Sequence, residues 1–299
     1  MTRCGIGRIG PALRRLDAPL TSAFALILAV SAHASGWPVI AGGSGELTDA
    51  LVKRLLDLGV EFVCGERVGR LDALPRTPIV MLDLTPHQFA ELAGDTLSRR
   101  YRRALERFRY GPGVFKIDYA LSEPVPWTNE GCRRAGTVHL GGTLDEVAAS
   151  EAEVEAGRHS DRPYVLTVQA TTADPTRAPA GKHTLWAYCH VPNGSTLDRT
   201  EAIENQIERF APGFRDTVIA RATRTASEYE RYDANYIGGD VNGGRAGLYQ
   251  AVLGPVPRWS RYRTPLAGVY LCSSSTAPGG GVHGMCGMNA AREALAARS

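Results

Sequence analysis

The most informative pattern of apolar and polar positions lies near the end of the chain. Residues 269–272 form a short run of apolar, β-branched and aromatic side chains, which predicts a buried strand, and the Ser/Thr/Pro/Gly segment after it predicts a loop. A helix is predicted from Gly281 to Ala297, with Gly281, Gly284 and Gly287 at every third position. We therefore expect a strand, a glycine loop and a helix whose first turns have a face without side chains.

Such an arrangement favours a ligand at the start of the helix. The first backbone N–H groups of a helix have no partner inside it, and its N-terminal end is positive, so this point suits a phosphate or another electron-rich group. The pattern predicts a cofactor-binding site. Close packing of the helix against a sheet, without any cofactor, also explains small residues on one face.

Earlier in the chain, the apolar positions predict two further helices and two strands. Leucines at 47, 51, 55 and 58 recur at helical spacing, with Ser44 as the expected N-cap and Gly59 as the stop. A strand is predicted at 60–64. Residues 78–84 predict a buried strand, and Thr85 followed by Pro86 predicts the start of the next helix, which makes a βα unit.

The middle of the chain predicts an antiparallel sheet with intervening helices. Runs rich in β-branched and aromatic residues occur at 114–119, 164–168 and 183–190. Thr143 and Glu146 form a capping box before a helix that extends to Gly157, and a further helix is expected at 197–210. Residues 98–110 predict an amphipathic helix with a basic face that carries Arg99, Arg100, Arg102, Arg103, Arg107 and Arg109.

The first 35 residues contain two patterns that point to alternatives. Residues 5–10 spell GxGxxG, but no strand precedes them, Pro11 follows the third glycine, and no acidic residue lies 20 positions further on, so they do not predict a dinucleotide site. A basic leader, an apolar run at 20–35 and an Ala-His-Ala sequence match a crude secretion signal. The apolar run is too short to span a membrane.

Composition narrows the classes of function. The chain has 299 residues, of which 43% are hydrophobic and 22% charged, and its net charge of +3 gives no electrostatic argument for a nucleic-acid partner. The six cysteines form no CxxC pair, so we expect reduced thiols and a cytoplasmic location. No HExxH, P-loop or GxSxG sequence is present, which disfavours the corresponding hydrolases.

The terminal sequence TPLAGVYLCSSSTAPGGGVHGMCGMNAAREAL resembles the closing motif of the phytoene dehydrogenase-like FAD oxidoreductases. In that family a strand ending GxYL leads through PGGGVxG into a helix with paired alanines, and the motif lies against the flavin. The resemblance extends over most of the chain, from about Leu16. It implies FAD contacts by Ser274, Ser275, Gly279, Gly280, Gly281, Val282, His283, Gly284 and Met285.

A second stretch, GGSGEL followed by LGVEFVCGERV, resembles the family's other FAD-contacting motif, and the resemblance implies a backbone contact by Val68. An ordinary strand position is the alternative for Val68. The resemblance also implies a mixed α/β fold with a partial FAD/NAD(P)-binding Rossmann-like domain (36–94 and 262–299). The substrate domain, with an antiparallel sheet and helices, is expected at 1–35 and 95–261, and the apolar run at 20–35 becomes one of its helices.

This chain departs from the family pattern in two places. Where the family has GAGT, the chain has Ser273, Ser274, Ser275 and Thr276, whose hydroxyls can hydrogen-bond the ribityl or phosphate groups. Family members begin with a strand, a GxGxxG turn and an acidic residue that bind the ADP half of FAD, and the chain has no credible equivalent. We therefore expect the C-terminal portion of a longer protein, without the ADP-binding module, that binds FAD weakly by itself.

The resemblance implies an FAD-dependent oxidoreductase that exchanges hydride between flavin and an apolar, unsaturated, carotenoid-like substrate. No catalytic acid or base is identified. Two alternatives stay open: a non-catalytic remnant or binding module that keeps the substrate-domain fold, and a mixed metal site from His283 with Cys286 or Cys189 with His190. The basic helix at 98–110 allows a peripheral contact with an anionic membrane.

Overall fold

The computed structural model describes residues 38–245, 250, 255–256, 260–281 and 283–298, together with Leu26, Val30, His33, Ala34 and Gly36. The GxGxxG at 5–10 and most of the apolar run at 20–35 lie outside the described residues. The chain divides into two compact units. Unit 1 comprises Met1–Phe62 and Val114–Ala226, and unit 2 comprises Val63–Gly113 and Ser227–Ser299.

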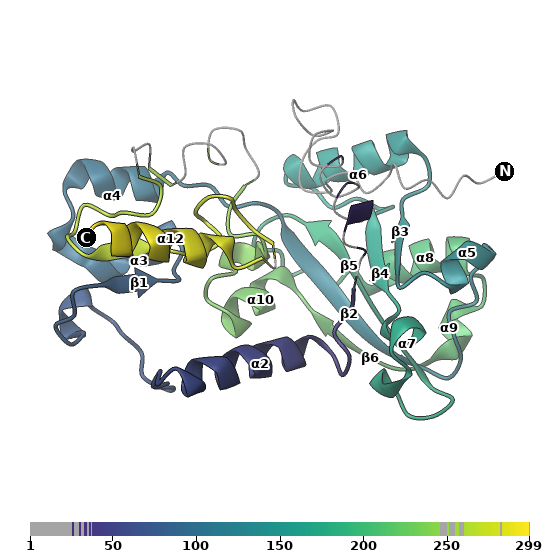
Figure 1. Ribbon diagram of the computed structural model, residues 1–299. Helices are drawn as coiled ribbons and strands as arrows, with labels where there is room; N and C mark the ends of the chain where they lie inside the picture. Colours follow the sequence, from purple (N-terminus) through teal and green to yellow (C-terminus); the bar gives the residue numbers. More distant parts are fainter. Residues whose placement is uncertain are drawn as a thin grey trace. The chain divides into compact units, whose positions relative to one another are not determined.

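Unit 1 is built on a five-stranded sheet with the order β3-β4-β5-β2-β6 (Figure 1). The pairs β3–β4, β4–β5 and β2–β6 are antiparallel, which confirms the predicted antiparallel sheet. The strands are β2 (Gly113–Leu121), β3 (Thr137–Leu140), β4 (Val165–Val168), β5 (His183–Val191) and β6 (Val218–Arg224).

Alternation along the strands gives unit 1 its core. In β2 and β5 every second side chain is buried, because successive residues of a strand point to opposite faces. Ile203 and Ile207 of α8 (Thr200–Phe210) belong to the same apolar cluster as these strand residues. The strand residues of the cluster include Phe115, Ile117, Tyr119, Leu121, Leu185, Ala187, Cys189 and Val191.

One helix start predicted in unit 1 is confirmed, and another lies later than predicted. The capping box of Thr143 and Glu146 is present and opens α6 (Leu144–Glu155), which confirms that prediction. Helix α8 starts at Thr200, three residues later than expected. The others are α5 (Glu130–Arg133), α7 (Ala170–Ala173), η4 (Pro175–Arg177), α9 (Phe214–Thr217) and α10 (Ala226–Tyr232), which crosses into unit 2.

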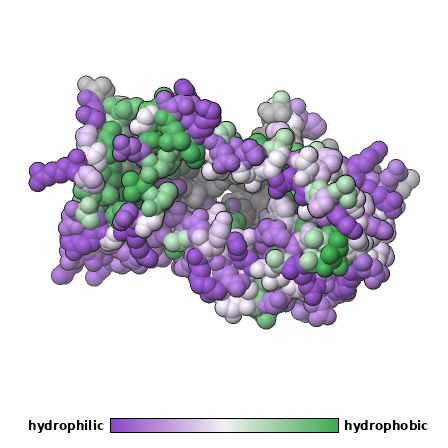
Figure 2. Space-filling view, turned by 90° about the horizontal axis from the view of Figure 1, so that it is seen from below, coloured by the Kyte–Doolittle hydropathy of each residue, from purple (hydrophilic) through white to green (hydrophobic). Residues whose placement is uncertain are grey.

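Helix α2 (Ser44–Asp57) forms as the leucine pattern predicts but buries no residue. Its N-cap is Gly43, with φ 111°, so the predicted cap at Ser44 is wrong: Ser44 is the first helical residue. Figure 2 shows exposed apolar residues in green on the surface seen from below, and α2 contributes Leu47, Leu51, Leu55 and Leu56 to the exposed apolar residues.

The strand predicted at 60–64 is wrong, because residues 60–70 form no strand and pair with no described strand. Phe62 and Val63 are exposed. A strand needs a neighbour to satisfy its backbone groups, and the apolar pattern alone does not provide one. A short turn, η2 (Leu71–Ala73), ends this segment.

Unit 2 contains a two-stranded parallel sheet, in which β1 (Val80–Leu82) pairs with β7 (Val269–Leu271). This confirms the strands predicted at 78–84 and 269–272, at shorter lengths. Helix α3 (Pro86–Ala93) opens with a capping box of Thr85 and Gln88. The other elements are η3 (Gly94–Thr96), α4 (Arg99–Glu106), η5 (Ile237–Gly239) and α12 (Met285–Ala296).

The core of unit 2 gathers residues of β1, β7, α3 and α4, among them Leu82, Leu271, Phe89 and Leu105. Helix α4 begins at Arg99 and ends at Glu106, so the helix predicted at 98–110 starts one residue early and ends four residues late. The parallel pair and the antiparallel sheet together confirm the predicted mixed α/β fold class. No helix in the described part of the chain is long and apolar enough to cross a membrane.

Candidate functional site

The candidate site lies in unit 2, at the carboxyl ends of β1 and β7. Because the two strands are parallel, the residues that follow each of them leave the sheet at the same edge, where α/β proteins usually bind their ligands. Two hydrogen bonds join the segments there. The Cys272 amide donates to the Leu82 carbonyl at 2.9 Å, and the Ser273 hydroxyl donates to the Leu84 carbonyl at 2.7 Å.

The segment after β7 forms a closed turn rather than an open loop. The Thr276 hydroxyl donates to the Ser273 carbonyl at 2.7 Å, and Ser273, Ser275 and Thr276 are all buried. Ser274 alone of the four hydroxyl residues is exposed. Ser274 is therefore the hydroxyl that a ligand can reach, whereas the neighbouring hydroxyls hold the turn together.

Burial also determines the protonation state of Cys272, the cysteine at this edge. Burial, and in second place the carboxylate of Asp83, raise the pKa of the Cys272 thiol to about 11. The thiol is therefore protonated at neutral pH, and a protonated thiol is a poor nucleophile. Cys272 does not carry thiolate chemistry here.

Helix α12 begins at Met285, so the prediction of a helix from Gly281 is wrong. Gly281 has φ 137° and Gly284 has φ 63°, a left-handed conformation at the N-cap position. The spacing of three glycines thus reflects turns in the loop, which glycine allows at positive φ, and not a bare helix face. Of the three, only Gly287 is helical, and nothing lies within 4 Å of a Cβ added there.

The start of α12 nevertheless presents free donors. The Met285 amide donates to Nδ1 of His283 at 3.0 Å, so this side chain caps the first turn. The amides of Cys286 and Gly287 have no partner within the helix, as at every helix start. His283, Gly284 and Met285 are exposed, so the positive end of α12 is open to a ligand.

A second glycine loop, residues 237–245, packs against the loop after β7. The Ser275 hydroxyl donates to the Gly243 carbonyl at 2.6 Å in a buried bond. A Cβ added at Gly243 would lie 2.1 Å from the Ser274 hydroxyl, and one added at Gly280 would lie 2.8 Å from the Asn242 carbonyl oxygen. Both glycines are therefore required for the close approach of the two loops.

Asp240 lies inside this second loop and is wholly buried, with 0% exposure. Its carboxylate accepts hydrogen bonds from the backbone amides of Gly111, at 2.7 Å, and Asn242, at 2.8 Å. Burial raises the pKa of Asp240, and backbone hydrogen bonds, including those of Gly243 and Gly244, only partly oppose that effect. The sequence analysis missed this loop, although glycine pairs on both sides of an aspartate were a visible signal.

The residues just before this loop are attached to the β1 side of the edge. The Asn235 side-chain amide donates to the Asp83 carbonyl at 2.9 Å, and the Gln88 side-chain amide donates to the Ala234 carbonyl at 2.9 Å. Segments near residues 83, 237 and 274 therefore meet at one place. Among the predicted site residues, Ser274, Ser275 and Gly280 contact the second loop, and Gly279, Gly281, His283, Gly284 and Met285 are near them in the sequence.

Two predicted contacts are not part of this group. Val68 lies in the segment before η2, with 43% of its surface exposed, and the alternative of an ordinary strand position is wrong because no strand forms there. Val282 lies outside the described residues. The contact predicted for each stays a prediction.

The two metal alternatives do not gather ligands in the described residues. Adjacent residues of a strand point to opposite faces, and Cys189 faces the core of unit 1 while His190 contacts Glu151, with Nδ1 3.0 Å from the carboxylate. The Cys286 thiol contacts the carbonyls of Thr276 and Gly279, each at 3.5 Å. No group of three or more His, Cys, Asp or Glu side chains suited to a metal occurs in the described part of the chain.

Unit 1 carries a half-buried aromatic row on the sheet face opposite its core. Trp186 and Tyr188 of β5 are stacked, with ring centroids 6.1 Å apart and planes at 14°. The ammonium of Lys116, which is paired with Asp118, lies 5.6 Å from the Trp186 ring. Burial, with a smaller contribution from Glu151, raises the pKa of Tyr188 to about 12, so its hydroxyl stays neutral. The two stacked rings offer planar apolar contact on this face.

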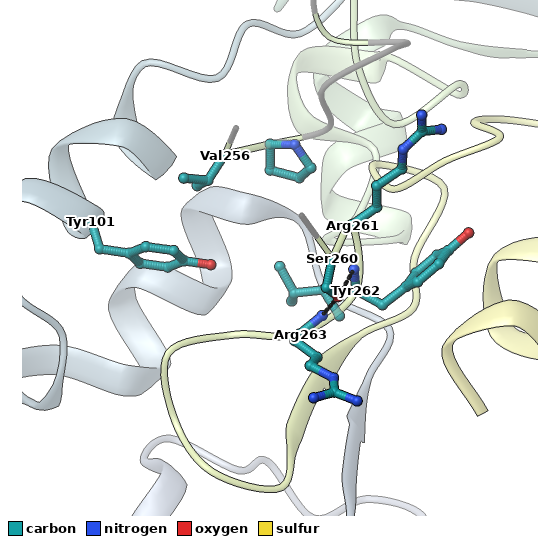
Figure 3. Close-up of a pocket in the computed structure, with 8 residues that line it drawn as sticks. Tyr101, Val256, Ser260, Arg261, Tyr262 and Arg263 are labelled. Carbon is teal, nitrogen blue, oxygen red and sulfur yellow. Dashed lines mark hydrogen bonds between the residues drawn. The ribbon is translucent and has the colours of Figure 1, made fainter. Parts of the chain in front are cut away.

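A small cavity elsewhere in unit 2 does not suit a cofactor. Its volume of 10 Å³ holds about one water molecule. The Ser260 hydroxyl in its wall accepts hydrogen bonds from the Tyr262 and Arg263 amides, as Figure 3 shows. The cavity is lined by Tyr101, Pro255, Val256, Ser260, Arg261, Tyr262, Arg263 and Leu271.

Comparison with known proteins supports a relationship to oxidoreductases. The chain is similar to "pyridine nucleotide-disulfide oxidoreductase domain-containing protein 2" from Mus musculus (34% identity) and Rattus norvegicus (26% identity), and each match covers 85% of this chain and 50% of the relative. The chain thus spans about half the length of the curated relatives it matches. No family model matches the sequence.

The fold is similar to that of a solved oxidoreductase from Methanosarcina mazei. The TM-score is 0.54 at 19% identity, and the match covers 85% of this chain and 55% of the solved one. At this identity the likeness concerns the fold alone. An oxidoreductase fold therefore agrees with the sequence relatives, whereas the narrower resemblance to phytoene dehydrogenases and the cofactor belong to a proposal.

Proposed function

We propose that the chain is part of an FAD-dependent oxidoreductase of the phytoene dehydrogenase-like type, which exchanges hydride with an apolar, unsaturated, carotenoid-like substrate. The observation that carries the proposal is the arrangement at the carboxyl edge of β1 and β7. There the glycine loop leads directly into the open N-terminus of α12. This is the place where a parallel sheet presents backbone donors to a cofactor.

The residues at this edge fit the flavin end of FAD. The amides of Cys286 and Gly287 and the exposed hydroxyl of Ser274 are donors, and Gly279, Gly281 and Gly284 add no side chain that would block them. Bound FAD would supply the hydride chemistry itself. The positive end of α12 would stabilise negative charge close to it by about 1 kcal/mol.

The substrate side of the proposal rests on unit 1. The stacked Trp186 and Tyr188 offer a flat apolar surface, and conjugated molecules stack well on such rings. Neither side chain carries a charge that an apolar substrate would have to desolvate. The assignment of 1–35 and 95–261 to a substrate domain, and of 36–94 and 262–299 to the FAD-binding domain, remains part of this proposal.

A peripheral membrane contact is a further part of the proposal, because an apolar substrate is held in membranes. Helix α4 and the residues after it present arginines, among them Arg99, Arg100 and Arg103, to an anionic surface. The proposal includes no nucleic-acid partner. A cytoplasmic location, from the reduced cysteines, is proposed on the same terms.

Binding of flavin fragments tests the proposal. If the described loops seat the flavin end, then FMN and FAD should bind the purified chain with similar affinity, and ADP should neither bind nor compete. We expect weak binding, with dissociation constants above about 1 µM, because the proposed site contacts the flavin end alone. Flavin fluorescence during titration measures each affinity.

The outcomes separate the two candidate functions. Competition by ADP with no binding of FMN would contradict the placement of the flavin at α12. Failure of FMN, FAD and ADP alike to bind would favour the alternative of a non-catalytic remnant or binding module. A variant Ser274→Ala, which removes the one exposed hydroxyl of the turn, serves as the matched test of the proposed contact.

A further inference from the structure

The buried carboxylate of Asp240 has no role in the chemistry proposed above. It makes no ion pair in the described part of the chain, and its carboxylate accepts hydrogen bonds from backbone amides. A buried carboxylate without a cation is costly, so a fold keeps it only when its hydrogen bonds fix something. The amides that it binds belong to two segments, residue 111 and residues 242–244.

The second of these segments forms the wall of the cofactor loop. Gly243 accepts the Ser275 hydroxyl through its carbonyl, and its missing side chain leaves room for Ser274. Asn242 likewise occupies the space beside Gly280. A shift of residues 242–244 should therefore displace both ends of the turn 274–280, because the two loops are closely packed against each other.

We propose that Asp240 is a positioning residue for the flavin seat, which holds residues 242–244 in the form that shapes the turn 274–280. The inference rests on the proposed function for the identity of the ligand. The coupling of the two loops is independent of the proposed function, because it concerns contacts within unit 2. Asp240 touches no part of the proposed ligand and acts through Asn242 and Gly243.

The variant Asp240→Asn tests the inference in the full chain. It keeps the size of the side chain but places an NH₂ donor where one backbone amide now finds an acceptor, so at least one bond to Gly111 or Asn242 is lost. We expect amide hydrogen exchange to accelerate at least about tenfold in 242–244 and also in 276–281. Exchange in β2 and β5 should not change. Asp72→Asn, the same change on an exposed carboxylate of unit 2, is the control.

Flavin affinity separates positioning from a merely structural role. At a temperature where the variant is folded, FMN should bind Asp240→Asn at least about tenfold more weakly than the unmodified chain. Faster exchange confined to 240–244, with unchanged FMN affinity, would overturn the inference. If the unmodified chain binds no FMN, the proposed function fails, and exchange in 276–281 alone decides whether Asp240 couples the loops.

Two further variants keep the test decisive if Asp240→Asn does not fold. Ser275→Ala removes the hydroxyl bond to Gly243 from the other side of the contact. Gly280→Ala adds a methyl group 2.8 Å from the Asn242 carbonyl oxygen. Coupled loops predict faster exchange at 242–244 in both variants. Exchange at 242–244 that stays unchanged in both would refute the coupling.

Discussion

Helices α8 and α2 belong to the same unit and have similar amphipathic patterns, yet only one of them is packed. Ile203 and Ile207 of α8 are 0% exposed and lie in the core of unit 1. Leu51 of α2 is 57% exposed, and the helix buries no residue. An apolar stripe therefore predicts that a helix forms and which face is apolar, but it does not tell what covers that face.

The difference has an energetic meaning. Burial of a large aliphatic side chain contributes about 1.5–3 kcal/mol, so the isoleucines of α8 stabilise the unit and the leucines of α2 do not. Isolated helices of about 14 residues are marginal in water. Helix α2 is accordingly expected to exchange its amide protons far faster than α8 does.

Truncation of a buried residue in α8 should give the largest effect. Ile207→Ala removes apolar atoms from the core and leaves a cavity, so we expect the free energy of unfolding to fall by about 2–5 kcal/mol. Denaturation in urea, followed by tryptophan fluorescence, measures the loss. A loss below about 0.5 kcal/mol would show that the core of unit 1 is not packed as described, and the comparison with α2 would collapse.

Capping signals predicted the starts of α6 and α3 correctly, whereas the apolar pattern did not predict what surrounds an element. The capping boxes at Thr143 and Thr85 involve residues three positions apart, so the sequence contains all of their partners. Whether residues 60–70 form a strand depends on a partner strand elsewhere in the chain, and the sequence of this segment does not reveal whether one is there. This is why the strand at 60–64 was predicted wrongly and β7 correctly.

The site shows the same limit. The edge at β7 and the loop after it could be predicted, because strand, loop and helix are consecutive. The packing of Asn242 on Gly280 joins residues 38 positions apart and could not be predicted from either segment. The glycines at 281 and 284 were mistaken for a helix face, since a spacing of three fits both a helix and a series of turns with positive φ.

Helix α12 adds a third helix to the comparison, because its N-cap residue, Gly284, has a left-handed backbone conformation. Gly284 has φ 63°, and nothing lies within 4 Å of a Cβ added there. An alanine would therefore strain the backbone without any clash, and Gly284→Ala should lower the stability of unit 2 by about 1–2 kcal/mol. A gain in helix propensity does not offset this loss, because Gly284 lies before the helix.

Asparagine at the same position provides the control. Asn adopts the left-handed conformation more readily than Ala, so Gly284→Asn should recover part of the loss. Thermal melts of both variants without flavin measure the difference. Equal losses for Ala and Asn would mean that something other than the backbone conformation makes glycine necessary there.

The smallest expected effect is also the most direct test of the difference between α2 and α8. Leu51→Glu places a charge on the exposed stripe of α2, where it meets water and not a packed neighbour. Glutamate and leucine have similar helix propensities, so the free energy of unfolding should change by less than about 0.5 kcal/mol. The same urea denaturation that measures Ile207→Ala measures this variant. A loss of about 2 kcal/mol or more would show that the stripe is buried in solution, because only a desolvated position makes an introduced charge that costly.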